Sequence, residues 1–420
     1  MNDDVRARTK ALGVAARAVL AELAASPLAA RNAALLAAAA ALDDAHPAIL
    51  AANEADMEEA AGGQPASAFL DRLRLDDGRI EAMARGLRTI AGLDDPLGRT
   101  LARWQRPNGL EISRLSVPIG VIGIIYEARP NVTADAGGLC LKAGNAVILR
   151  GGSASLRSSR AIHRCLLAGL SEAGLPATAV QMVADRERAA VGAMLAMNGL
   201  IDVIVPRGGK SLTERVQGDS RVPVLAHLDG ICHTYIHAAA DEEKARAIVL
   251  NAKMRRPGIC GATETLLIDA AIAAHLLPAV VDDLTGAGCD LRGDARASAI
   301  DSRIGPPPAN WDTEYLDAIL AIRVVDGIDQ ALDHIAAHGS GHTEAIVTGD
   351  PAVAERFLQT VDAAIVIHNA SSQFADGGEF GMGAEIGIAT GRLHARGPVG
   401  LEQLTTYKYV VRGSGQVRDL

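Results

Sequence analysis

The feature that most constrains the fold is a regular alternation of apolar runs and helical segments between residues 117 and 226. The run Val117–Tyr126 is continuously apolar and rich in β-branched residues, as expected of a strand buried on both faces of a parallel sheet. Repeated strand–helix units at this spacing predict a doubly wound, mostly parallel sheet with helices on both faces. The further strands are expected at Asn145–Leu149, Val180–Val183, Leu200–Val205 and Val222–Ala226, and the helices at 132–142, 155–173, 186–197 and 209–218.

A second alternation begins near residue 230 and predicts a second α/β region. Residues 290–312 are rich in Gly and Pro and predict a surface excursion without regular structure. Upstream, Asn108–Gly109 between two strand-like runs predicts a β-hairpin, and residues 4–61 and 76–92 predict helices. In the second region, strands are expected at His233–His237, Glu264–Ile268, Glu344–Thr348 and Ala364–His368, and helices at 241–254, 270–285, 328–338 and 351–361.

Composition excludes several classes of function. A chain of 420 residues predicts roughly two or three domains. Its net charge of −9 and its low aromatic content of 3% argue against nucleic acid as a partner. The apolar stretch Ala33–Leu42 is too short to span a bilayer, which takes about 20 residues, so no membrane partner is expected.

The cysteine count bears on the compartment. There are five cysteines and no CxxC pair, which argues against a disulfide framework or a structural zinc site. The N-terminus carries charged residues without an apolar core, so no signal peptide is expected. Both observations favour a reducing, cytoplasmic location.

One cysteine stands in a loop suited to chemistry. Cys260 follows Pro257–Gly258 after a predicted helix and has small neighbours, which leave its sulfur accessible and let a backbone N–H approach an oxyanion. Lys253, Arg255 and Arg256 lie just upstream, and we expect them to lower the thiol pKa and attract an anionic substrate. A buried structural cysteine is the alternative.

Three histidines, His334, His338 and His342, are spaced four apart, a spacing that could suggest a metal site. Gly339 and Gly341 break the helix before His342, and no second ligand cluster is visible. We therefore predict no metal and expect these residues to shape their lobe.

Six stretches together resemble the γ-glutamyl phosphate reductase family of the aldehyde dehydrogenase superfamily. They occur in order and at similar spacing from about residue 110 to 409, and several are long, so their joint specificity is high. The stretches are Pro118–Thr133, Gly144–Gly152, Pro206–Gly209, Ala331–Ile346, Asp376–Glu385 and Leu393–Pro398.

The resemblance implies an α/β, aldehyde dehydrogenase-like fold with three parts. A Rossmann-like cofactor domain would comprise residues 1–108 and 119–228, an α/β catalytic domain 229–397, and a small β oligomerisation flap 109–118 and 398–420. It also implies NADPH-dependent reduction of L-glutamyl 5-phosphate to L-glutamate 5-semialdehyde, through a cysteine thioester, in proline biosynthesis. The implied partners are a small-molecule substrate, further copies of the chain and, transiently, the upstream glutamate kinase.

The resemblance assigns the catalytic and substrate-binding candidates. By family position Cys260 is the nucleophile, and Asn131 or Arg129, just after the first sheet strand, contacts the substrate near the oxyanion. Basic side chains are suited to holding phosphate or the α-carboxylate. The candidates for that role are Lys253, Arg255, Arg256 and Arg396.

The cofactor candidates follow predicted strands. Arg150, Gly151 and Ser153 lie at a carboxyl end, where adenosine ribose binds in open α/β folds. Many NAD-preferring relatives have an acidic residue near the position of Ser153, so Ser153 with Arg150 favours a 2′-phosphate and NADP(H). Gly208 and Gly209 open a helix whose free N–H groups can face the pyrophosphate.

The resemblance to superfamily members assigns expected roles to two further residues. Glu314 lies where relatives hold the nicotinamide ribose. His227 lies near the position of a Glu that activates water in hydrolytic relatives, and a reductase with phosphate as leaving group needs no water. In one alternative, His227 or Asp229 is the base of an aldehyde-oxidising enzyme; in another, the chain is a catalytically silent scaffold.

Overall fold

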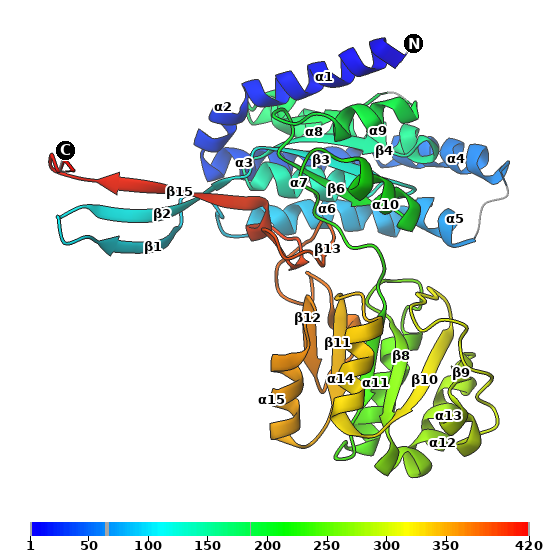
Figure 1. The fold of residues 1–420 in the computed structure, drawn as a ribbon. Helices are drawn as coiled ribbons and strands as arrows, with labels where there is room; N and C mark the ends of the chain where they lie inside the picture. The colour runs from blue at the N-terminus through cyan, green and yellow to red at the C-terminus, as the bar shows by residue number, and fades with distance from the viewer. Residues whose placement is uncertain (1, 64–66, 185, 419–420) are drawn as a thin grey trace. The chain divides into compact units, whose positions relative to one another are not determined.

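The computed structural model describes residues 2–63, 67–184 and 186–418, and the contacts within it divide the chain into two compact units. The first unit comprises Met1–Ala226, Gly381–Gly387 and Val399–Leu420, and the second comprises His227–Phe380 and Ile388–Pro398. Each unit contains a parallel sheet with helices around it (Figure 1). The predicted α/β class is confirmed.

The sheet of the first unit has four parallel strands in the order β5-β4-β3-β6. Tyr126 at the end of β3 aligns with Gly151 on β4 and with Arg207 on β6. The carboxyl ends of these three strands therefore lie at one edge, which the three following turns share. The strands are β3 (Val121–Tyr126), β4 (Ala146–Gly151), β5 (Val180–Met182) and β6 (Val203–Arg207).

Helices cover both faces of this sheet (Figure 1). Small residues bring the helix backbones close together, since a Cβ on Gly169 would lie 2.2 Å from the carbonyl oxygen of Ala34. The helices are α1 (Asn2–Ala18), α2 (Leu20–Ala25), α3 (Leu28–Asp44), α4 (His46–Ala61), α5 (Ser67–Leu73), α6 (Asp77–Gly92), α7 (Val132–Lys142), α8 (Leu156–Glu172), α9 (Arg188–Leu195) and α10 (Lys210–Asp219).

Among the described helices, none is by itself long and apolar enough to cross a bilayer. One bent pair, Asp3–Ala25 with Leu28–Asp44, passes on length and composition alone.

A three-stranded antiparallel sheet also belongs to the first unit. Its order is β1-β2-β15, with β1 (Thr100–Gln105), β2 (Glu111–Pro118) and β15 (Thr405–Arg412). Gly109 has φ +84° in the turn between β1 and β2, a value that favours glycine. The C-terminal strand lies beside β2, red against cyan in Figure 1. The predicted hairpin and its C-terminal partner strand are confirmed.

The second unit has six parallel strands in the order β12-β11-β7-β8-β10-β9. Because β7 lies between β8 and β11, the segments that precede these three strands meet at the amino edge of the sheet. The strands are β7 (Cys232–Ile236), β8 (Thr263–Asp269), β9 (Asp290–Gly293), β10 (Ile319–Val325), β11 (Thr343–Val347) and β12 (Ile365–His368). The helices are α11 (Glu242–Met254), α12 (Ala270–Gly286), α13 (Ala295–Ile300), α14 (Gly327–His338) and α15 (Pro351–Thr360).

The secondary structure differs from the sequence expectation in three places. The segment 290–312 contains β9 and α13, since Asp294 caps α13 and β9 pairs with β10. The strand β10 was not predicted because Arg323 interrupts its apolar run, and Arg323 is accommodated by a 2.6 Å contact with His334 Nδ1. Residues 222–226 form no strand, and only an isolated bridge joins Val224 to Ile204.

Candidate active site

Cys260 lies in the turn between α11 and β8, at the amino edge of the second unit's sheet. Its side chain is partly exposed, whereas the other four cysteines are buried. The backbone at Gly230 passes so close that a Cβ there would lie 2.2 Å from the Cys260 carbonyl oxygen. The same carbonyl accepts a hydrogen bond from Cys232 Sγ at 3.0 Å. The backbone around the thiol is therefore tightly fixed while the sulfur stays accessible.

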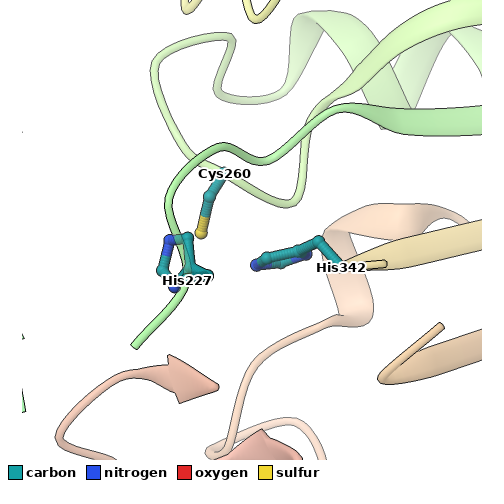
Figure 2. A group of neighbouring side chains, drawn as sticks. All are labelled: His227, Cys260 and His342. Carbon is teal, nitrogen blue, oxygen red and sulfur yellow. The ribbon is translucent and has the colours of Figure 1, made fainter. Parts of the chain in front are cut away.

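Two imidazoles face this thiol (Figure 2). His227 lies in the segment before β7, and His342 directly precedes β11. One nitrogen of each ring and Cys260 Sγ all lie within 4.8 Å of one another. The rings meet edge to face, with centroids 5.0 Å apart and an angle of 76° between their planes. Three segments far apart in sequence thus form one Cys–His–His cluster.

Hydrogen bonds fix the proton on His227. Its Nδ1 lies 2.7 Å from the carbonyl oxygen of Ile388, which can only accept, so Nδ1 carries a proton. His342 is fully buried, and its Nδ1 lies 2.9 Å from the Thr343 hydroxyl. Its Nε2 has no hydrogen-bond partner among the described residues. Each ring therefore offers one nitrogen for chemistry with the thiol.

The electrostatics of this cluster favour the thiolate. Burial by itself raises the pKa of Cys260, but His342 and then His227 outweigh burial and hold the pKa well below its ordinary value of 9.0. A thiolate at neutral pH is the reactive form of a cysteine nucleophile. Cys260 therefore has the environment of a nucleophile.

The source of this effect differs from the sequence expectation. We expected Lys253, Arg255 and Arg256 to lower the thiol pKa, but Lys253 Nζ lies 2.6 Å from Glu264 Oε2 and both side chains are fully buried. Their charges pair inside the protein, so Lys253 faces an internal carboxylate instead of a substrate. Arg255 and Arg256 are exposed, and Arg255 donates a 3.4 Å hydrogen bond to Gln373 Oε1.

Two further candidates lie in the second unit. Glu314 Oε1 accepts a hydrogen bond of 2.8 Å from the backbone N–H of Gly230, the residue packed on Cys260. Burial raises the pKa of Glu314. Arg396 forms an ion pair of 2.6 Å with Asp362. Glu314 is thus close to the nucleophile, whereas Arg396 already has a carboxylate partner.

The cofactor candidates gather at the carboxyl edge of the first unit's sheet. Gly151 ends β4, and Gly208 and Gly209 lie between β6 and α10. A Cβ on Gly208 would lie 2.7 Å from the Leu212 side chain and 2.8 Å from that of Glu127, so a larger residue there would displace these two side chains. Ser153 is exposed and opens the 3-10 turn Ser153–Ser155 that leads into α8.

The other polar candidates of this unit lie nearby in the chain. Arg150 on β4 is buried, donates to the backbone oxygen of Arg186 at 3.4 Å, and leaves its Nε without a partner in the described residues. Arg129 and Asn131 lie in the turn between β3 and α7, and Asn131 Nδ2 donates to Asp135 at 3.0 Å. Asn131 and Cys260 belong to different units.

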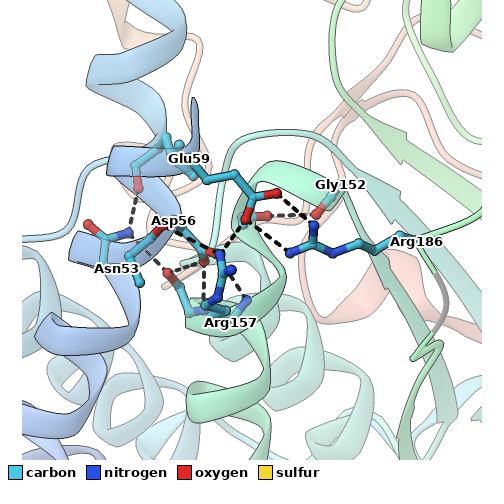
Figure 3. Close-up of polar contacts among 10 residues, drawn as sticks. Asn53, Asp56, Glu59, Gly152, Arg157 and Arg186 are labelled. Atoms are coloured by element: carbon cyan, nitrogen blue, oxygen red, sulfur yellow. Dashed lines mark hydrogen bonds and ion pairs between the residues drawn. The ribbon is translucent and has the colours of Figure 1, made fainter. Parts of the chain in front are cut away.

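A charged network surrounds the start of α8 (Figure 3). Glu59 on α4 lies 2.6 Å from both Arg157 and Arg186, and these hydrogen bonds hold its pKa at about 2. Beneath them, buried Asp56 accepts from the Ser158 amide at 2.8 Å and its hydroxyl at 2.7 Å. Two guanidinium groups are thereby held near the Gly152–Ser153 turn.

Sequence reasoning missed the two imidazoles and this network. His227 was expected to stand in place of a hydrolytic carboxylate or, in one alternative, to act as a base, and His342 was expected to shape its lobe. No local signal links His227, Cys260 and His342, because only the order of strands in the sheet makes them neighbours. The sequence does offer one signal for the network, because Arg157 lies shortly after the predicted cofactor turn.

Comparison with known proteins gives consistent matches. Residues 3–306 match the aldehyde dehydrogenase family. The γ-glutamyl phosphate reductase of Rhodospirillum rubrum is 64% identical over 417 residues, covering 99% of this chain and 98% of that protein.

Solved structures agree with these matches. The crystal structure of γ-glutamyl phosphate reductase from Thermotoga maritima superposes with a TM-score of 0.95 at 41% identity, covering 98% of this chain and 100% of that one. An engineered glycolyl-CoA reductase with bound NADP⁺ superposes with a TM-score of 0.67, covering 96% of each chain. At 18% identity, this last likeness shows the fold alone.

Proposed function

The chain belongs to the γ-glutamyl phosphate reductases of the aldehyde dehydrogenase family, and we propose that it reduces L-glutamyl 5-phosphate to L-glutamate 5-semialdehyde and phosphate. The electron donor is NADPH, and the reaction is a step of proline biosynthesis. The observation that carries the proposal is the partly exposed Cys260, whose pKa is held low by His342 and His227. An acyl phosphate is the class of substrate that a thiolate attacks with phosphate as leaving group.

The first half of the reaction uses the Cys–His–His cluster. Cys260 Sγ attacks the acyl carbon, the carbon–oxygen bond to phosphate breaks, and a thioester forms. The proton that left the thiol resides on an imidazole and passes to the departing phosphate, which accounts for the one proton that the overall reduction consumes. Backbone N–H groups around the Cys260 turn are suited to stabilising the tetrahedral oxyanion.

The second half returns the free thiolate. Bound NADPH supplies the hydride for reduction of the thioester. The carbon–sulfur bond then breaks, the aldehyde leaves, and the two imidazoles again stabilise the Cys260 thiolate. Glu314, through its hydrogen bond to Gly230, positions the backbone that packs on Cys260.

A specific observation favours a second candidate, an aldehyde dehydrogenase that transfers the acyl group to water. His227 lies beside Cys260 with its ring oriented by the Ile388 carbonyl, and an imidazole so placed can activate water. The two reactions differ in the acyl acceptor: phosphate in one, water in the other. They are therefore distinguishable by omitting phosphate from the reverse reaction.

The residues of the first unit fit NADP(H). Arg150 has a buried Nε without a partner among the described residues, and Gly208 and Gly209 lie in the turn that opens α10. Arg157 and Arg186 supply two guanidinium groups near Ser153, and a 2′-phosphate can take the place of Glu59 between them. The NADP⁺ in the engineered glycolyl-CoA reductase lends support from a protein of the same fold.

The remaining roles rest on the family and on composition. We assign cofactor binding to 1–108 and 119–228, catalysis to 229–397, and homo-oligomer formation to 109–118 with 398–420. Phosphate or α-carboxylate binding is proposed for Arg255, Arg256 and Arg396, and oxyanion contact for Asn131 or Arg129. A cytoplasmic location and transient contact with glutamate kinase complete the proposal.

The reverse reaction tests this function. The purified protein is supplied with L-glutamate 5-semialdehyde and NADP⁺, with and without phosphate, beside a Cys260→Ala variant. We expect NADPH to form only with phosphate and only in the wild-type protein. Equal NADPH formation without phosphate would assign water as the acceptor and establish the second candidate.

A further inference from the structure

The Cys–His–His cluster has the composition of a metal site. Cys260 Sγ and one nitrogen each of His227 and His342 lie within 4.8 Å of one another. In a tetrahedral zinc site, with Zn–S about 2.3 Å and Zn–N about 2.0–2.1 Å, the ligand atoms lie roughly 3.3–3.6 Å apart. The widest separation in the cluster therefore needs to contract by roughly 1.2–1.5 Å at most. Rotation of the partly exposed Cys260 and His227 side chains can supply this contraction while the backbone stays in place.

The hydrogen bonds around the cluster match those of metal-binding histidines. A metal-ligating histidine donates its other ring N–H to a carbonyl or carboxylate, which fixes the ring and the tautomer. His227 Nδ1 makes this bond to the Ile388 carbonyl at 2.7 Å. The hydrogen bond that orients a metal-ligating histidine is therefore already present at His227.

His342 provides an independent observation. Its side chain is fully buried, and its Nε2 has no hydrogen-bond partner within the described part of the chain. A buried polar nitrogen without a partner costs free energy, which a bound ligand would recover. In Figure 2 the outer end of the His342 ring points toward Cys260 and His227.

We propose that His227, Cys260 and His342 bind one Zn²⁺ ion and that this ion reversibly inactivates the protein. One thiolate and two imidazoles favour Zn²⁺ or Co²⁺ over Mg²⁺ and Ca²⁺, which prefer oxygen ligands. Cys260 binds as the thiolate, any thiol proton passing to solvent, and both imidazoles bind as neutral rings. The ion occupies the sulfur lone pair that attacks the acyl carbon, and water completes its fourth position.

The inactivation rests on the proposed function, whereas metal binding does not, so binding is measured without substrate. Metal-free, reduced full-length protein is titrated with Co²⁺ and followed by sulfur-to-cobalt charge-transfer absorption. In parallel, Zn²⁺ protection of Cys260 from iodoacetamide is measured by peptide mass spectrometry. Cys165→Ala and His338→Gln are matched controls, since Cys165 is buried in the first unit and His338 pairs with Asp312.

We expect one ion per chain, full protection of Cys260, reversal by a chelator, and no protection by Mg²⁺. His227→Gln should weaken binding by about tenfold or more, Cys260→Ser should lose the absorption band, and both controls should bind like wild type. An absent band, an unprotected thiol, or unchanged binding in Cys260→Ser would overturn the proposal.

Turnover in the reverse direction is then measured at the same Zn²⁺ concentrations. We expect the activity to fall in step with protection of the thiol. Protein that binds Zn²⁺ at the cluster but loses no activity would contradict inactivation and the nucleophile role of Cys260 together. Protein that binds Zn²⁺ but never turns over this substrate would leave the metal site standing and contradict the proposed function.

Discussion

The two units carry their candidate residues at opposite edges of their parallel sheets. In the first unit, the turns with Gly151 and Gly208 follow the carboxyl ends of β4 and β6. In the second, His227, Cys260 and His342 precede the amino ends of β7, β8 and β11. Ligands of open α/β sheets usually bind at the carboxyl edge. The first unit follows this rule for binding, whereas the second positions a nucleophile in a way the rule does not predict.

The comparison predicts that chemistry and cofactor binding can be separated by mutation. Cys260→Ala should lower kcat by on the order of 10⁴-fold, because no other group can form the thioester. NADPH binding, measured by fluorescence titration, should be unchanged, since Arg150, Ser153 and Gly208 lie in the first unit and Glu314 keeps its side chain. Cys165→Ala is the control and should retain full activity. If Cys260→Ala abolished NADPH binding, catalysis and cofactor binding could not be assigned to different regions of the protein.

A Lys253 variant distinguishes a structural role of this side chain from a role in substrate binding. Lys253→Met should lower the free energy of unfolding by about 3–5 kcal/mol, because it leaves Glu264 buried without its partner. The double variant Lys253→Met/Glu264→Leu should regain most of that loss. Urea denaturation measures the free energy of unfolding of the single and the double variant. A stable single variant with a raised KM for substrate would restore Lys253 as a substrate ligand.

His342 tests whether the amino edge activates the thiol. His342→Gln should lower kcat by about 10²-fold, within the range of general acid–base catalysis, while the KM for NADPH stays constant. His338→Gln, at a partly exposed position paired with Asp312, should behave as wild type. Steady-state kinetics give kcat and the KM for NADPH of both variants. Equal effects in the two variants would assign His342 a structural role.

The carboxyl edge is expected to show a smaller effect, confined to the cofactor. Arg186→Ala should raise the KM for NADPH by about tenfold through loss of one charge-assisted hydrogen bond, with kcat unchanged. The KM for NADH should change little, because NADH lacks the 2′-phosphate. Arg85→Ala, an exposed arginine on α6, is the control. Equal changes for both cofactors would argue against a 2′-phosphate at this network.

Much of this organisation was predictable from sequence, for physical reasons. Strands such as Val121–Tyr126 are buried on both faces and therefore read as continuous apolar runs, and the glycine turns follow them directly. Cys260 was predictable because Pro257 and Gly258 end a helix before it. The strand β10 was missed because Arg323 lies within it and needs partners distant in sequence. His342 acquires its role only through the pairing of β11 with β7, which no local pattern encodes.

The central claim is that His342 and His227 keep Cys260 as a thiolate, and the pH dependence of its alkylation tests this most directly. The rate of iodoacetamide reaction at Cys260 is measured across pH in wild-type protein and in His342→Gln. Because the folded pKa is depressed, the reactive thiolate should persist as pH falls from 9 and be lost only near the lowered pKa. The variant should lose reactivity at a distinctly higher pH. A wild-type midpoint near 9 that the variant leaves unchanged would contradict the account.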